Sequence, residues 1–215
     1  MLPIDGTAHS LDVLLEIAEG NENLADFRIV RFLAWSPPGS ITQSESEREY
    51  FWFRALPTEA FKTRLLSLRD EHLGEKRTAI GFCSTARSKD GSILYIPQLD
   101  FSSPVSEDSL ALIKQKFETI MGKATSGKVM PGYILASGES YHYIGLKLLA
   151  PEEWLEFMGL ALLFEDRSDR NKFSPVDRRW IGHSLIRRHG ALRLFGVEKT
   201  TGGIRPEPVV VGFIG

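Results

Sequence analysis

Residues 132–149 read GYILASGESYHYIGLKLL, and this stretch decides the central part of the fold. It contains two apolar runs, 132–137 and 141–149, whose tyrosines and isoleucines are typical of β-strands. The connection between them, at Gly138 and Glu139, is too short for anything but a tight turn. We therefore expect two consecutive strands here, joined without a helix.

The flanking sequence continues this pattern of paired strands separated by single helices. Further strands are expected at 27–35, 49–56, 77–84, 92–101, 191–197 and 209–213. Helices are expected to begin near Leu11, Pro57, Ser106, Pro151 and Val176. The segments 77–84 and 92–101 are expected to pair with each other through a turn at 89–91. This order predicts an α+β fold, with a mixed or antiparallel sheet packed against helices.

Length and composition place the chain among ordinary globular proteins. Its 215 residues are 42% hydrophobic and 25% charged, enough to bury a sizeable core. Its one cysteine, Cys83, excludes an internal disulfide and a thiolate zinc cage. The longest apolar run, 157–164, is far shorter than a bilayer helix, and no secretory signal is visible. We expect a cytoplasmic protein without membrane contact.

The charge is distributed unevenly along the chain. The formal net charge is −2, but residues 1–165 carry 16 basic and 23 acidic side chains, a charge of −7. Residues 166–205 carry ten basic and four acidic side chains, a charge of +6. This basic tract is either a surface that faces phosphates or a solvated helix whose arginines pair within the chain.

Three short elements contain side chains suited to phosphate or metal chemistry. Asp100 lies at or near the end of an expected strand that is largely apolar. A carboxylate there needs a cation, hydrogen bonds or solvent; alternatively it caps the next turn. Ser140 and His142 are two residues apart on a strand, so both project from one face and can donate to phosphate oxygens. Asp177 is an acid within the basic tract, either paired with adjacent arginines or binding a metal.

In this order and at these separations, the three elements resemble the motifs of the archaeo-eukaryotic primase superfamily. Leu99-Asp100 is similar to its first acid motif, and Ser140-Tyr141-His142 matches its Ser-x-His motif. Asp177 is the candidate for its third acid. The resemblance covers about residues 78–205. It implies a primase–polymerase core with an RRM-like sheet over 76–215, and residues 1–75 are expected to be an α/β segment integrated in the same domain.

The resemblance implies a nucleotidyltransferase that uses Mg²⁺ or Mn²⁺ to add nucleotides on a single-stranded DNA or RNA template. Asp100 and Asp177 would be the catalytic metal ligands. The nucleoside triphosphate would be bound by Ser140, His142, Arg179 and Arg193. A helicase or another replication protein would be a partner on a separate chain.

One departure from the family pattern leaves a second possibility open. Gln98 stands where the paired acid of the first motif is expected, so a carboxylate is missing. One Mg²⁺ with bound phosphates commonly takes only one or two carboxylates, whereas a two-metal site needs more negative charge. The alternative is therefore an inactive primase-fold protein that binds nucleotide or single strands. A third hypothesis, a metal-dependent phosphoesterase, would use His142 and His183 with the two aspartates.

Overall fold

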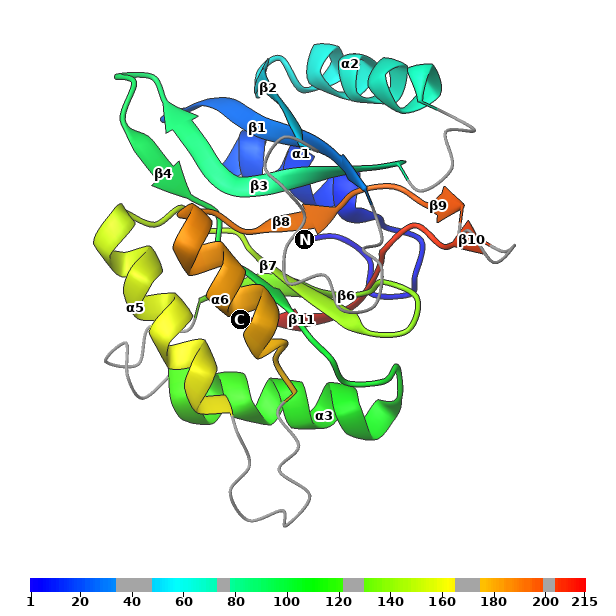
Figure 1. The fold of residues 1–215 in the computed structure, drawn as a ribbon, viewed down its shortest axis with the longest axis vertical. Helices are drawn as coiled ribbons and strands as arrows, with labels where there is room; N and C mark the ends of the chain where they lie inside the picture. Colours follow the sequence, from blue (N-terminus) through cyan, green and yellow to red (C-terminus); the bar gives the residue numbers. More distant parts are fainter. Residues whose placement is uncertain (34–47, 73–77, 122–129, 165–174, 199–203) are drawn as a thin grey trace.

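A computed structural model describes residues 1–33, 48–72, 78–121, 130–164, 175–198 and 204–215. Within these ranges the chain forms an α+β fold with antiparallel sheets, as expected (Figure 1). No helix in the described ranges is long and apolar enough to cross a bilayer. Gly74 and Gly122, at which the sequence predicts that the helices from Pro57 and Ser106 end, lie outside the described residues.

The first sheet contains five strands. Four of them follow the order β2-β1-β3-β4, and β8 also pairs with β3. β4 pairs with residues 85–87 of β3, and β8 pairs with residues 81–83. Its strands are β1 (Leu24–Leu33), β2 (Glu49–Arg54), β3 (Thr78–Ser88), β4 (Ile93–Tyr95) and β8 (Ala191–Arg193). All of its pairings are antiparallel. The N-terminal strands β1 and β2 therefore share a sheet with β3 and β8, which come much later in the chain.

The second sheet contains four antiparallel strands in the order β11-β6-β7-β5. They are β5 (Gln98–Asp100), β6 (Gly132–Ala136), β7 (Tyr141–Gly145) and β11 (Val209–Ile214). The stretch 132–145 forms the central hairpin of this sheet. A short pair, β9 (Val197–Glu198) with β10 (Ile204–Arg205), lies between β8 and β11 in the chain.

The expectation of one strand over 92–101 is wrong, because the chain changes sheets at Ile96 and Pro97. Residues before this point form β4 and pair with β3, whereas those after it form β5 and pair with β7. Proline has no N–H to continue a ladder, which is the physical reason for the break. The carbonyl of Pro97 instead accepts a 2.8 Å hydrogen bond from the amide of Gly145. Asp100 is thereby placed in the second sheet, beside the central hairpin.

Five α-helices are described, and they cover the sheets from different sides (Figure 1). They are α1 (Ser10–Gly20), α2 (Thr58–Glu71), α3 (Glu107–Lys116), α5 (Pro151–Ala161) and α6 (Arg178–Arg187). A π-helical turn over 117–121 extends α3, and a 3-10 turn over 162–164 extends α5. The N-terminus of α3 is capped as expected, since the Ser106 hydroxyl accepts from the amide of Ser109.

Alternating side chains of the second sheet enter two separate hydrophobic clusters. Leu135 and Ile144 pack into the cluster shared with α1, α2 and the first sheet. Ile134 and Tyr143, on the opposite face, pack into the cluster formed with α3 and α5. Each such fully buried side chain contributes about 1.5–3 kcal/mol. A sheet covered on both faces has little freedom to change register, so the side chains it carries are held in place.

The joint between β3 and β8 depends on a close backbone approach at Gly81. A methyl group at this position would clash with the carbonyl oxygen of Leu192 and lie 2.9 Å from the Phe32 ring. We expect Gly81→Ala to lower the free energy of unfolding by about 1–3 kcal/mol, the typical cost of overpacking. The matched control is Gly182→Ala in α6, where nothing lies within 4 Å of the added methyl. It should raise stability by about 0.5–1 kcal/mol. Urea unfolding measures both, and equal effects would contradict the close approach.

Candidate nucleotide and metal site

The central feature of the site is the pairing of β5 with β7. Asp100 ends β5, and its partner on β7 is His142, which in turn pairs with Leu135 of β6. Directly paired residues share a face, so Asp100 and His142 project on the same side as Leu135. The Nε2 atom of His142 lies 3.6 Å from Oδ1 of Asp100. The Asp100 side chain retains 27% of its exposure, so a solute can still reach it.

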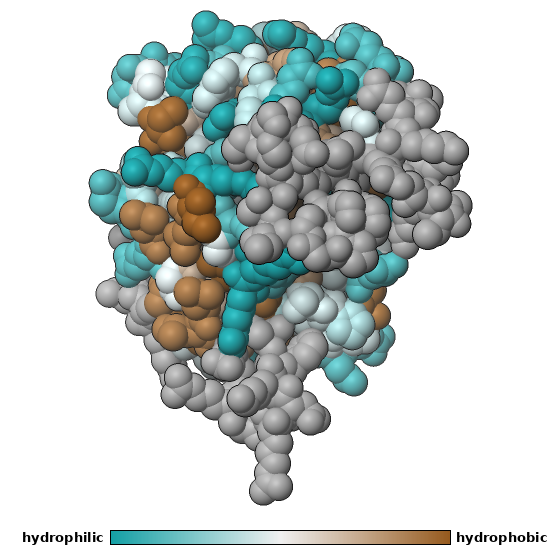
Figure 2. Space-filling view, viewed as in Figure 1, coloured by the Kyte–Doolittle hydropathy of each residue, from teal (hydrophilic) through white to brown (hydrophobic). Residues whose placement is uncertain are grey.

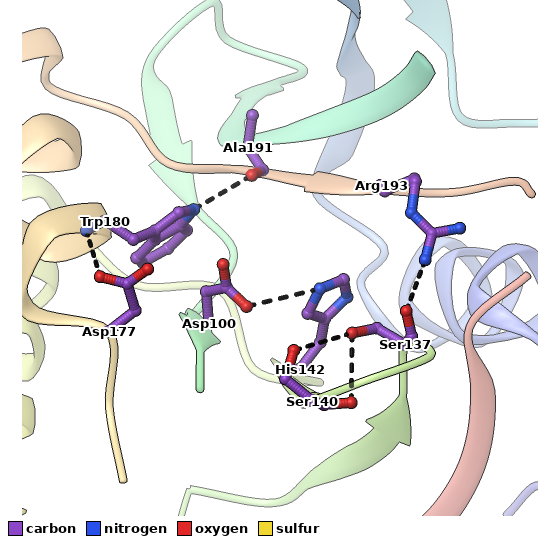
Figure 3. Close-up of polar contacts among 8 residues, drawn as sticks. All are labelled: Asp100, Ser137, Ser140, His142, Asp177, Trp180, Ala191 and Arg193. Atoms are coloured by element: carbon purple, nitrogen blue, oxygen red, sulfur yellow. Dashed lines mark hydrogen bonds and ion pairs between the residues drawn. The ribbon is translucent and has the colours of Figure 1, made fainter. Parts of the chain in front are cut away.

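The start of α6 brings Asp177 to the same place. The amide of Asp177 donates a 2.9 Å hydrogen bond to the carbonyl oxygen of Asp100. Its Oδ1 accepts from the amide of Trp180 at 3.0 Å and caps the helix, while the Trp180 indole donates to the Ala191 carbonyl of β8. Figure 3 shows the Asp100 and Asp177 carboxylates side by side, with the His142 ring on the far side of Asp100. Three elements distant in sequence therefore converge.

The Asp177 carboxylate lies close enough to affect the ionisation of Asp100. Burial is the largest influence on Asp100, and the negative charge of Asp177 is the second; together they raise the Asp100 pKa to about 7. The charges of Arg205 and Arg193 and the amide of Phe101 act in the opposite direction without cancelling these effects. The positive charges near these two acids are too few to balance them. Binding of a cation at this place would therefore be favourable.

His142 is a neutral imidazole in this setting. Burial, followed by the charges of Arg193 and Arg205, lowers its pKa to about 3. Its Nδ1 atom is buried and has no hydrogen-bond partner among the described residues. A neutral imidazole offers one N–H donor and one acceptor nitrogen, so His142 can bind a phosphate oxygen without first taking up a proton.

Arg193 lies beside the site, but its guanidinium is already engaged by three backbone carbonyls. Its NH1 nitrogen donates to Phe195 at 2.7 Å and to Pro206 at 2.6 Å, and its NH2 nitrogen donates to Ser137 at 2.6 Å. Burial lowers its pKa to about 10, so it remains charged. Arg193 therefore links β8 to the turn that precedes β7. Its positive charge also lowers the pKa of Asp100 in part.

Ser140 and Arg179 lie at the edge of this arrangement. Ser140 closes the turn between β6 and β7, where the amide of Ser137 donates to the Ser140 carbonyl at 2.8 Å. The hydroxyls of Ser137 and Ser140 are 3.3 Å apart. Gly138 has a φ of +109°, a conformation that side chains strongly disfavour, which explains the glycine in this turn. Arg179 is exposed in the first turn of α6, two residues after Asp177.

The structure adds one residue that sequence reasoning missed. Arg205, at the end of β10, is close enough to influence the pKa values of Asp100, His142 and Arg193. In the sequence it is only one of the ten basic residues of the tract 166–205, and no motif spacing marks it. Its position follows from the return of the chain toward β11, which only the tertiary fold reveals.

Gln98 shares the strand face of Asp100 but lies deeper. Its side chain is fully buried, its amide nitrogen is 3.5 Å from the Phe82 carbonyl, and its Oε1 has no partner in the described structure. The described residues hold no cluster of three or more histidine, cysteine or acidic side chains arranged for a metal. The phosphoesterase hypothesis, which requires His142, His183 and both aspartates together, thus gains no support.

Comparison with known proteins identifies one family. A family model described as AEP-like, archaeo-eukaryotic primase 1D-like, matches residues 59–201, which is about two thirds of the chain. The matched range contains Asp100, His142, Asp177 and Arg193, but ends before Arg205. No curated protein sequence matches the chain.

The raised pKa of Asp100 predicts a pH-dependent gain of stability in Asp100→Asn. The unfolded carboxyl has an ordinary pKa of 3.8, against about 7 in the folded protein. Between these values the folded state binds more protons, so the ionisation of Asp100 reduces stability as the pH rises. In chelator, Asp100→Asn should melt at least about 2 °C above wild type at about pH 8. This gain should disappear toward about pH 4. A gain that is constant with pH would contradict the assignment.

The three carbonyl contacts of Arg193 predict a large structural role. Arg193→Met preserves most of the side-chain length but leaves the Ser137, Phe195 and Pro206 carbonyls without this donor. Each buried group left unpaired costs about 1–3 kcal/mol, so we expect a loss of about 3 kcal/mol or more. Lys147→Met is the matched control on the surface, with an effect within about 0.5 kcal/mol. Urea unfolding distinguishes them, and similar values for the two variants would refute the role.

Proposed function

Because the chain belongs to the archaeo-eukaryotic primase 1D-like family, we propose that it is a primase-like nucleotidyltransferase. It would add nucleotides on a nucleic-acid template with the help of a divalent metal ion. The single observation that carries this proposal is the convergence of Asp100, Asp177 and His142 from β5, the start of α6 and β7.

The donor set fits a hard divalent cation bound together with substrate. Mg²⁺ and Mn²⁺ prefer oxygen ligands, and Mg²⁺ commonly takes one or two carboxylates, substrate phosphate oxygens and waters. Asp100 and Asp177 would supply the carboxylates, and their unbalanced negative charge favours such an ion. When bound, the ion neutralises phosphate charge and orients the triphosphate.

The protein's own groups would hold the triphosphate from the other side. The Ser140 hydroxyl and the neutral His142 ring are donors for phosphate oxygens, while Arg193 and Arg205 provide a positive field. Arg179 is exposed in the first turn of α6, two residues after Asp177, and is suited to pair with phosphates at the edge of the site. Phosphoryl transfer depends mainly on positioning and electrostatic stabilisation, which these groups can supply.

Gln98 favours a second candidate function, a nucleotide-binding protein of the same fold without catalysis. Its uncharged amide occupies the same strand face as Asp100 and is fully buried. Two ions held about 3.5–4 Å apart require more negative charge than two aspartates provide. In this case nucleotide would still bind at Asp100, Asp177 and His142, but no product would form.

Incorporation of a labelled nucleotide on a primed single-stranded template with Mn²⁺ tests the proposal. Wild type should form product, and Asp100→Asn should reduce the rate by about 100-fold or more, since it removes one of the two carboxylates that would hold the divalent ion. Asp108→Asn, at an exposed acid in the first turn of α3, is the matched control and should retain full activity.

The outcome without product separates the two candidates. If wild type forms no product but binds nucleotide in a metal-dependent manner, the non-catalytic function replaces the proposed one. Absence of both product and nucleotide binding, or equal activity in Asp100→Asn and Asp108→Asn, would refute a functional site at Asp100.

A further inference from the structure

A separate group of charged and aromatic side chains covers the outer face of the first sheet. The register of β1 and β2 pairs Arg28 with Trp52 and Asp26 with Arg54, so these side chains share one face. Phe27 and Phe53, which pair on the opposite face, are buried in the core with α1. We call the outer group the arginine face and define it by Arg28, Tyr50, Trp52, Arg54 and Arg87.

The arginine face is turned toward the viewer in the figures. In Figure 1, α1 lies behind β1 and β3, so the side away from the core faces the front. In the same view, Figure 2 shows mainly hydrophilic and pale side chains over the upper part of the molecule, where these strands run. The larger brown, apolar area lies lower on the left, where Figure 1 shows α5 and α6, and a smaller brown group lies at the upper left.

Two of the three arginines of this face, Arg28 and Arg87, are stacked on aromatic rings. The guanidinium carbon of Arg28 lies 4.0 Å from the centre of the Tyr50 ring and 6.0 Å from that of Trp52. The guanidinium carbon of Arg87 lies 4.2 Å from the centre of the Trp52 ring. Cation–π stacking holds a guanidinium in place while its N–H edge stays available, so less side-chain entropy is lost when an anion binds.

The face carries a surplus of positive charge. Among the described residues, Asp26 is the one acid that pairs with these arginines, with Oδ1 at 3.5 Å from Arg54 and Oδ2 at 3.7 Å from Arg87. Among the described residues no carboxylate lies within 4 Å of the Arg28 guanidinium. The described part of this face thus has three arginines and one aspartate, which contacts Arg54 and Arg87. Residues 1–165 are acidic overall, so such a concentration of cations on one face suits an anionic partner.

The arginine face is connected to the candidate site by α6. The Tyr50 hydroxyl lies 3.1 Å from Nε2 of His189, which follows the C-terminal end of α6. Asp177 caps the other end of the same helix. Ten helical residues span about 15 Å, which is about four nucleotides at a rise of about 3.4 Å each. The arginine face and the candidate site thus lie near opposite ends of one short helix.

We propose that the arginine face binds single-stranded nucleic acid. Arg28, Arg54 and Arg87 would pair with phosphates, and exposed bases would stack on Tyr50, Trp52 or the guanidinium planes, a combination that suits single strands. This proposal adds a binding surface to the proposed function. It rests on the proposed function in one respect, that the bound strand is the template. β1 and β2 precede residue 59, so most of this surface lies outside the region that the family model matches.

Anisotropy of a labelled single-stranded oligonucleotide, without metal or nucleotide, tests the surface. Arg28→Gln and Arg87→Gln should each weaken binding about tenfold and reduce the slope of log affinity against log salt by about 0.7. Arg28→Lys keeps the charge but not the planar stack, so it should keep the slope while losing affinity. Melting temperatures near that of wild type would show that the variants are folded.

Arg64→Gln is the matched control for these substitutions. Arg64, on α2, also stacks on a ring, with its guanidinium carbon 4.2 Å from the centre of Phe53, but on the opposite face of the sheet. It should leave affinity and slope unchanged. The proposal is overturned if Arg28→Gln and Arg87→Gln bind as wild type, or if Arg64→Gln weakens binding equally. Equal affinity for a polyglutamate peptide would also overturn it in favour of an acidic protein partner.

Two further results separate this proposal from the catalytic one. Asp100→Asn should retain single-strand binding even where incorporation is lost, because it lies outside the arginine face. Conversely, if wild type binds single strands through this face but forms no product, the arginine-face proposal is confirmed and only the nucleotidyltransferase proposal is wrong.

Discussion

The hydrogen bond from the amide of Asp177 to the carbonyl of Asp100 is the constraint on which the candidate site depends. It joins the start of α6 to the end of β5, so two carboxylates separated by 76 positions in the chain must lie side by side. The helix cap at Trp180 then fixes one oxygen of Asp177. Burial, followed by repulsion from Asp177, raises the pKa of Asp100. The negative charge that is costly in this buried position is the charge that a divalent cation would require.

Arg193 shows how the surrounding structure supports this arrangement. Its three carbonyl contacts connect the turn that precedes His142, the segment after β8 and the approach to β11. The same charge helps to keep His142 neutral and partly offsets the burial of Asp100. A residue expected to bind phosphate thus has a structural task that precedes any contact with substrate. Arg205, which was not expected, contributes to the same positive field.

The molecule combines a site within the region matched by its family with a surface that lies mainly before it. The Asp100 site depends on buried, fixed groups, whereas the arginine face depends on guanidinium groups stacked on Tyr50 and Trp52 at the surface. In the two proposals, binding of a strand and chemistry on a nucleotide would take place near opposite ends of α6. Gln98 bears only on the chemistry, since it lies on β5 beneath Asp100.

Local sequence determined the elements whose signals are local. The apolar runs around Gly138 predicted the hairpin of β6 and β7, and Ser106 predicted the cap of α3, because turn and cap chemistry act over a few residues. The motif residues Asp100, His142 and Asp177 were also chosen from the sequence. What the sequence could not decide was the change of sheets at Pro97, the engagement of Arg193 and the presence of Arg205. Each of these depends on backbone groups from distant segments, whose positions are set by packing on both faces of the second sheet.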